Sequence, residues 1–114
     1  MAAQDYLDLL ERRVLRRSVT LSALGVEEVA WTETDARLVV AALQDSHWAI
    51  LGGDVLRIGA NAPEYTYDSW HSGPRNGETP REFVERTHTE TLQYIDAYPN
   101  RESHLYTLVC SRVV

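Results

Sequence analysis

A pair of glycines between two apolar runs limits the folds that this chain can adopt. Residues 48–51 are wholly apolar, Gly52, Gly53 and Asp54 follow, and residues 55–58 are largely apolar again. This order is typical of two strand segments separated by a backbone irregularity, because glycine tolerates positive φ and leaves room for a neighbouring backbone. We predict a structural turn at Gly52 and Gly53, with a bulge and a ligand-binding loop as the alternatives.

The helices are predicted from apolar spacing and from capping residues. Residues 4–17 carry apolar side chains at helical spacing, and a second helix is expected to begin after Thr32 or Thr34. The clearest start is the third, where Thr79 serves as the cap, Pro80 occupies the first helical position and Glu82 completes a capping box. The sequence therefore predicts about three helices.

The strands are predicted from β-branched and aromatic runs at residues 26–31, 48–51, 55–58, 65–71 and 104–114. Residues 72–78 are rich in glycine and proline and mark the most flexible connection in the chain. We expect an α+β fold, a mainly antiparallel sheet of about four or five short strands with the helices largely on one face. With 114 residues, the chain is interpreted as a single domain spanning 1–114.

Composition excludes several classes of function. The sequence contains no lysine, which rules out a Walker-type phosphate loop and a Schiff-base nucleophile. A net charge of -6 argues against nucleic-acid binding, since the phosphate backbone would be repelled. Cys110 is the only cysteine, so no internal disulfide is available and the cytoplasm is the simplest compartment. No apolar run approaches the roughly 20 residues that cross a bilayer, so no membrane partner is expected.

Catalytic patterns are weak throughout the sequence. There is no G-x-S-x-G motif, and Cys110 lies in a predicted strand where cysteine usually packs as a small apolar residue. The nearest constellation for metal or acid–base chemistry is Asp54, Asp68 and His71, which defines the alternative hypothesis of a small metal-dependent hydrolase. The leading interpretation has no catalytic residue, no metal site and no cofactor, so the chain is not expected to be an enzyme.

A cluster of aromatic and polar residues is the better candidate for function. Tyrosine and tryptophan next to exposed carboxylates are typical of protein-binding surfaces. We predict a partner-binding site that contains Asp54, Tyr65, Tyr67, Asp68, Trp70 and His71. A second alternative is a homo-oligomeric structural domain in which the C-terminal strand pairs with its own copy.

The run Ile50 to Val55, the Tyr67 to His71 segment and the helix through Phe83 and Tyr94 resemble the immunity protein 40 family of bacteria. The resemblance covers most of the chain from about Ser18 onward. It implies a cytoplasmic, stoichiometric inhibitor that binds and neutralises a cognate polymorphic toxin domain in the producing cell. No catalytic residue comes with the family.

Overall fold

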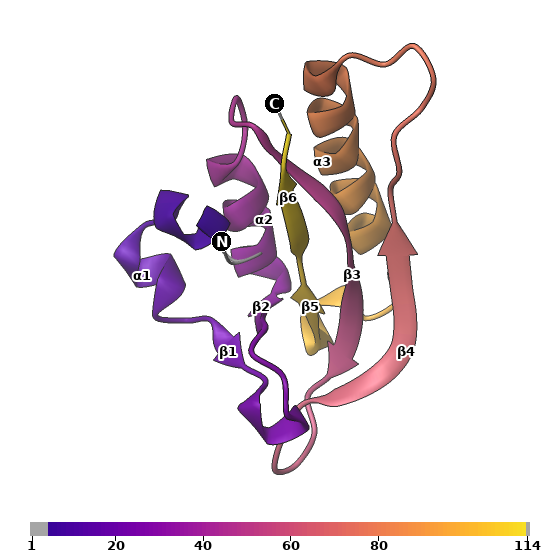
Figure 1. The fold of residues 1–114 in the computed structure, drawn as a ribbon. Coiled ribbons are helices and arrows are strands. Elements are labelled where there is room, and N and C mark those ends of the chain that lie inside the picture. Colours follow the sequence, from indigo (N-terminus) through magenta and orange to yellow (C-terminus); the bar gives the residue numbers. More distant parts are fainter. Residues whose placement is uncertain (1–4, 114) are drawn as a thin grey trace.

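The computed structural model describes residues 5–113, which form a six-stranded antiparallel sheet with helices packed against it (Figure 1). The strand order is β1-β2-β5-β3-β4, and β6 also pairs with β3. The α+β class predicted from the sequence is confirmed. In chain order the elements are α1 (Arg12–Leu15), β1 (Val19–Thr20), β2 (Val29–Thr32), α2 (Glu33–Ala42), β3 (Trp48–Arg57), β4 (Glu64–His71), α3 (Pro80–Ala97), β5 (His104–Thr107) and β6 (Val109–Arg112).

Strand β3 is the centre of the sheet. It pairs with β4 on one side, while β5 and β6 follow each other along its other side. The predicted turn at Gly52 and Gly53 is wrong, because both glycines lie inside this continuous strand. The register shifts between Ile50 and Gly52 where β3 pairs with β6, so the bulge alternative describes the backbone.

Close approach of neighbouring backbones explains the two glycines. A Cβ on Gly52, whose φ is +148, would lie 2.1 Å from the carbonyl oxygen of Trp70. A Cβ on Gly53 would lie 1.9 Å from the carbonyl oxygen of Thr107. The glycines therefore let β3 fit between its neighbours, and they do not reverse the chain.

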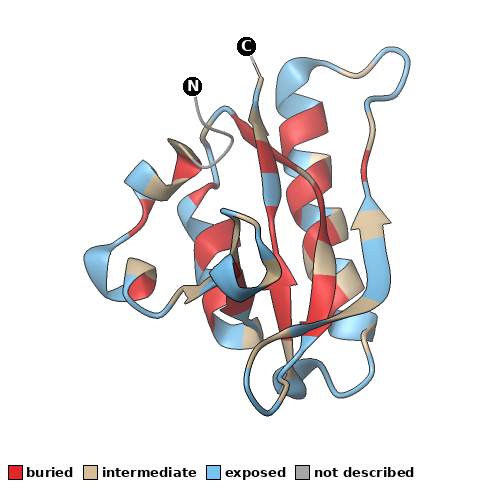
Figure 2. Cartoon of the chain, turned by 60° about the horizontal axis from the view of Figure 1, so that its bottom comes forward, coloured by how far each residue is buried: buried red, intermediate tan, exposed pale blue. Residues whose placement is uncertain are grey.

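The two faces of the sheet are covered differently. Trp31, Val55 and Tyr106 pack with α2 and α3 in the main core, while their sequence neighbours Ala30, Leu56 and Leu105 pack on the opposite face. There the apolar cover comes from residues 19–26 and Tyr65, and the 58–63 loop lies beside Leu105. Figure 2 shows buried residues along the central strands and on the helix sides that meet them. We name the side away from α2 and α3 the open face.

Local capping chemistry places both long helices as predicted. Thr32 accepts a hydrogen bond from the Asp35 N–H at 3.2 Å, and Thr79 and Glu82 form the capping box in front of Pro80. None of the helices in residues 5–113 has the length and apolar character that crossing a bilayer requires.

The predicted continuous helix over residues 4–17 is wrong. A short 3-10 helix covers Asp5–Leu9, Glu11 is extended, and α1 begins at Arg12. Tertiary contacts override the helical pattern: the Tyr6 ring meets Trp48 edge-on at 6.4 Å, and α1 is followed by Arg17, which binds Asp35 of α2. Residue 4 and Val114, at the ends of two predicted elements, lie outside the described residues.

Candidate interaction surface

The predicted binding residues lie on β4 and the adjoining part of β3. Among the described residues, β4 is an edge strand that pairs only with β3. Its pairing changes between Asp54, opposite Ser69, and Leu56, opposite Tyr65, so β4 carries extra residues within this stretch. A bulge of this kind bends an edge strand and re-aims its side chains.

Tyr67 lies in this bulge with a φ of 69, and its side chain is 91% exposed. Thr66 closes the bulge, since its hydroxyl donates to the Val55 carbonyl at 2.8 Å and accepts from the Asp68 N–H at 3.1 Å. A left-handed conformation costs a bulky residue about 1–3 kcal/mol. Tyr67 is therefore an exposed aromatic residue held in a strained conformation.

Residues that share the open face gather around Tyr67. Its ring centroid is 6.3 Å from that of Tyr65, which packs beside Leu56 on this face. Because Val55 points into the main core, its neighbour Asp54 points to the open face, opposite Ser69. We define the open-face patch as Asp54, Tyr65, Tyr67, Ser69 and His71.

The Asp54 carboxylate is half-buried and makes no hydrogen bond or ion pair with any residue between 5 and 113. Its backbone N–H, in contrast, donates to the Thr107 hydroxyl at 2.8 Å. The backbone of this residue is fixed by the sheet, and its charge stays free for another contact.

Trp70 and Asp68 lie on the other side of β4 and contact α3. The Trp70 indole stacks on Tyr94 with ring centroids 4.8 Å apart, and its N–H donates to the Thr91 hydroxyl at 3.2 Å. The Tyr98 hydroxyl donates to Asp68 at 2.7 Å, and burial together with this bond raises the pKa of Tyr98. The structure thus divides the predicted set, and these two side chains join β4 to α3.

The hydrolase alternative gains no support from the geometry. Asp54 and Asp68 point to opposite sides of the sheet, and no group of three or more His, Cys, Asp or Glu in residues 5–113 is arranged to hold a metal ion. Burial raises the pKa of the Cys110 thiol to about 12, so this cysteine is a packed residue and a poor nucleophile.

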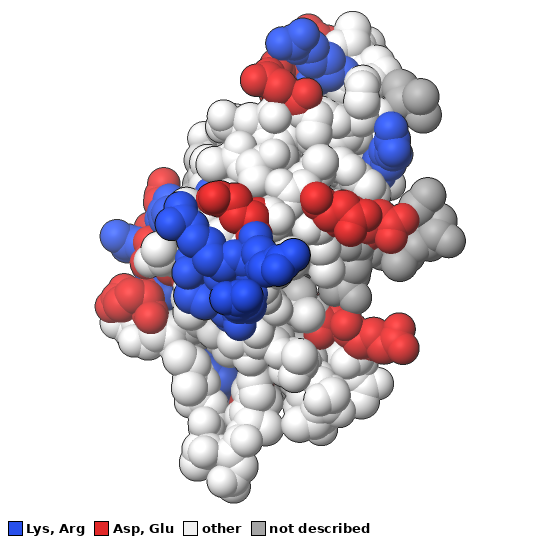
Figure 3. Space-filling model, turned by 90° about the vertical axis from the view of Figure 1, so that its left-hand side faces the viewer, with Lys and Arg blue, Asp and Glu red and all other residues white. Residues whose placement is uncertain are grey.

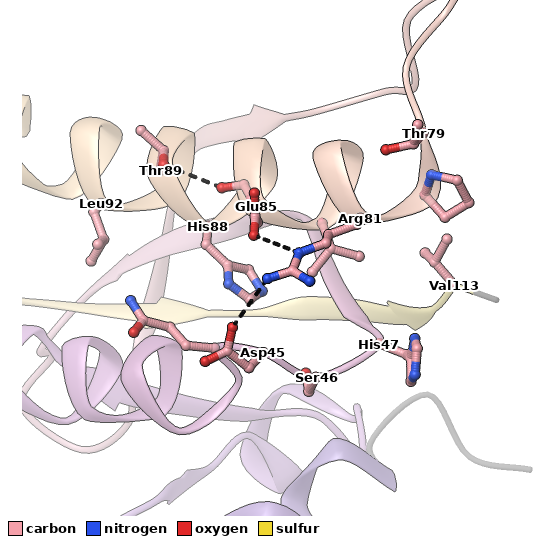
Figure 4. A pocket seen from close by; sticks show the side chains of 13 residues that line it. Asp45, Ser46, His47, Thr79, Arg81, Glu85, His88, Thr89, Leu92 and Val113 are labelled. Carbon is pink, nitrogen blue, oxygen red and sulfur yellow. Dashed lines mark hydrogen bonds and ion pairs between the residues drawn. The ribbon is translucent and has the colours of Figure 1, made fainter.

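A pocket of about 600 Å³ lies elsewhere, between the turn at residues 44–47 and the N-terminal half of α3 (Figure 4). Its walls come from segments far apart in the chain, so no local pattern in the sequence predicted it. His47 and His88 line it, and neither belongs to the site predicted from the sequence.

A family model described as Immunity protein 40 matches residues 20–110, which is most of the chain. The chain belongs to the Immunity protein 40 family. No curated protein and no solved structure matches the chain. Membership of this family indicates a protein that confers immunity to a toxin.

The part of the chain matched to the Immunity protein 40 family contains the whole open-face patch. It leaves out the exposed arginines of the N-terminal segment, which contribute to the basic area in Figure 3. Arg17 of this segment binds the buried Asp35 through two nitrogens, with the shortest contact at 2.8 Å. The open-face patch therefore lies in the region that the family model matches, whereas the N-terminal arginines lie near the opposite edge of the sheet (Figure 1).

Proposed function

We propose that this chain is an immunity protein that binds a cognate toxin domain and blocks it, one to one, in the cytoplasm of the bacterium that makes both. Family membership supports the protective role. The observation that carries the binding site is Tyr67, whose side chain is 91% exposed in a strained backbone conformation. Strain of this kind persists only where the surrounding structure holds it in place, and it is concentrated at functional sites.

The composition of the open-face patch suits protein recognition. Tyrosine presents a large amphipathic area and loses little conformational entropy on binding, so tyrosines are frequent among the residues that dominate binding energy. Tyr65 supports Tyr67 from one side, and the Asp54 carboxylate has no partner among residues 5–113. We propose that the toxin covers these three side chains.

The bulge gives the patch a second property. An unpaired strand edge invites pairing with other copies of the chain, and a bulge that twists the edge away reduces this risk. Tyr67 breaks the regular geometry of β4 with its φ of 69. The bulge therefore displays the aromatic ring and also disfavours self-association at β4.

Co-expression with the toxin domain encoded next to this gene tests the proposal. We expect a complex that survives gel filtration and a toxin that loses activity. Tyr67→Gly removes the ring and relieves the backbone strain, so the folded protein stays stable while affinity falls about thirtyfold, as for a dominant interface residue. Calorimetric titration measures the affinity.

Two further variants sharpen the result. Asp54→Asn removes a charge without removing any bond within residues 5–113, so it should weaken binding and leave the urea midpoint unchanged. Leu38→Ala is the matched control, because Leu38 is an exposed apolar residue on α2, outside the open-face patch. A toxin that stays fully active, with no complex on gel filtration, would refute the proposed function. Equal affinity of Tyr67→Gly and the unchanged protein would refute the proposed site.

A further inference from the structure

The α2–α3 pocket, named here for the helices beside it, is a second concave site, and no residue of β4 lines it. Its volume of about 600 Å³ lies within the usual range for small-ligand sites, about 300–1,000 Å³. One wall is the turn from Gln44 to His47, and the other is α3 from Thr79 to Leu92. Val84, Leu92 and Val113 provide apolar lining suited to a hydrocarbon stem.

His88 provides a buried polar group in this lining. The residue is 5% exposed, and its Nε2 is 2.8 Å from the Trp48 carbonyl oxygen on β3. A carbonyl only accepts, so Nε2 carries the proton. Burial lowers the pKa of His88, which keeps the ring neutral at neutral pH and leaves Nδ1 as an acceptor with no bonded partner among residues 5–113. Nδ1 is not sealed from solvent, so an N–H donor of a ligand in the pocket can bind it.

The mouth of the pocket already holds a guanidinium group between two carboxylates (Figure 4). The Arg81 Nε lies 3.1 Å from Glu85, and an Arg81 terminal nitrogen lies 3.9 Å from Asp45 across the opening. All three side chains are more than half exposed, so these ion pairs are weak and exchangeable. Two carboxylates against one guanidinium leave an excess negative charge at the mouth.

We propose that the α2–α3 pocket binds a cation on an apolar stem, of the arginine or lysine side-chain type. The stem lies along Val84 and Leu92, the charged head displaces Arg81 from Asp45 and Glu85, and a donor N–H reaches His88. The cation belongs either to a side chain of a protein partner or to a free small molecule. This site is separate from the open-face patch and does not depend on it.

Nuclear magnetic resonance with Nα-acetyl-arginine amide as the probe tests the chemistry. We expect saturable shifts confined to the residues that line the pocket, with a dissociation constant on the order of 1 mM. Nα-acetyl-norleucine amide, which keeps an apolar stem without the charge, should bind about tenfold more weakly. Absence of saturable shifts, or equal binding of the two probes, would overturn the proposal.

Variants at the mouth, compared with the same change in charge outside the pocket, separate a local effect from a non-specific charge effect. Glu85→Gln should weaken probe binding about fivefold, whereas Arg81→Ala should strengthen it about threefold because the internal competitor is gone. Arg13→Ala makes the same change in net charge at an exposed position outside the pocket and should leave binding unchanged. Weaker binding to Arg81→Ala would contradict the displacement step.

His88→Gln tests the pocket lining and should weaken the probe about tenfold, with the folded state verified by its amide spectrum. The toxin then distinguishes the two sources of the cation. Competition between the probe and the toxin assigns the site to a side chain of the partner. Probe binding that is unchanged in the toxin complex assigns it to a free small molecule and leaves the open-face proposal intact.

Discussion

Backbone packing on both sides of Gly52 and Gly53 determines what these positions tolerate. Gly53 lies between the Trp70 ring and the Thr107 carbonyl. A Cβ added to Gly53 would lie 2.6 Å from a Trp70 ring carbon and 1.9 Å from the Thr107 carbonyl oxygen. A side chain there must displace part of the sheet that also aligns β4 for the open-face patch. The same position therefore affects stability and the geometry of the proposed site.

Gly53→Ala should lower the free energy of unfolding by about 3 kcal/mol, because the added methyl group would clash with backbone atoms of Thr107 that cannot rotate away. Gly73→Ala is the matched control, since its Cβ would meet only a His71 ring carbon at 3.5 Å, an ordinary contact. Urea denaturation of both variants measures the difference. Similar midpoints for the two would show that β3 can shift to accommodate a side chain.

Patterns of single residues correctly predicted the features that depend on nearby positions in the sequence. Thr79, Pro80 and Glu82 specify a helix start through contacts within one turn, and the structure has that start. The exposure of Tyr67 depends on how many residues β4 places opposite β3, which an alternating pattern does not reveal. The glycines of β3 are required by the close approach of Trp70 and Thr107, which are both distant in sequence. Composition alone therefore could not distinguish a turn from a bulge at these positions.

The connection from β4 to α3 shows how an element is held by one charged residue. Its glycines and proline indicated flexibility, yet Arg86 of α3 binds Glu78 at 2.6 Å and also donates to the Gly73 carbonyl. Arg86 further pairs with Glu90, whose carboxylate accepts from the Ser72 hydroxyl at 2.6 Å. Arg86 therefore clamps both ends of the connection onto α3. The charged residues are visible in the sequence, but their contacts are not, because these contacts form only when the connection folds back against α3.

The clamp predicts a pH dependence of stability. The hydrogen bond from Arg86 lowers the pKa of Glu78 from its ordinary 4.5 to about 2. A carboxylate with a lowered folded-state pKa stabilises the fold above its unfolded pKa, and this contribution is lost as the pH falls from 4.5 towards 2. Glu78→Gln should be less stable at neutral pH and should lose less stability over this acidic range.

Urea midpoints measured between about pH 2 and pH 7 follow this effect. Glu102→Gln removes the same charge from an exposed residue outside the clamp and serves as the control. A Glu78→Gln profile parallel to that of the unchanged protein would contradict the clamp. Glu90 retains part of the dependence in the variant, since Ser72 and then Arg86 lower its pKa as well.

At the scale of the whole molecule, the N-terminal segment is part of the core even though its first residues precede the family match. Tyr6, Leu10 and Val14 are buried with Trp48 of β3 and with residues of α2 and α3. Arg17 adds a bidentate ion pair to Asp35, which is 4% exposed. The sequence predicted an amphipathic helix here, but not that a broken one would close the core. Residues outside the family match thus complete the packing of residues inside it.

This arrangement predicts that the N-terminal segment unfolds together with the sheet. Tyr6 is 1% exposed, so Tyr6→Ala should lower the free energy of unfolding by about 3–5 kcal/mol, in the range of other aromatic-to-alanine changes in cores. Tyr6→Phe keeps the ring against Trp48 and should cost only about 1 kcal/mol.

Tryptophan fluorescence reports on Trp31 and Trp48 in the core, and circular dichroism reports on the helices and strands. Coincident single transitions by both methods, shifted to lower urea in Tyr6→Ala, are expected from one cooperative core. If Tyr6→Ala instead lost part of the signal at low urea and then showed the main transition at the original midpoint, the N-terminal segment would unfold separately from a sheet that is stable without it.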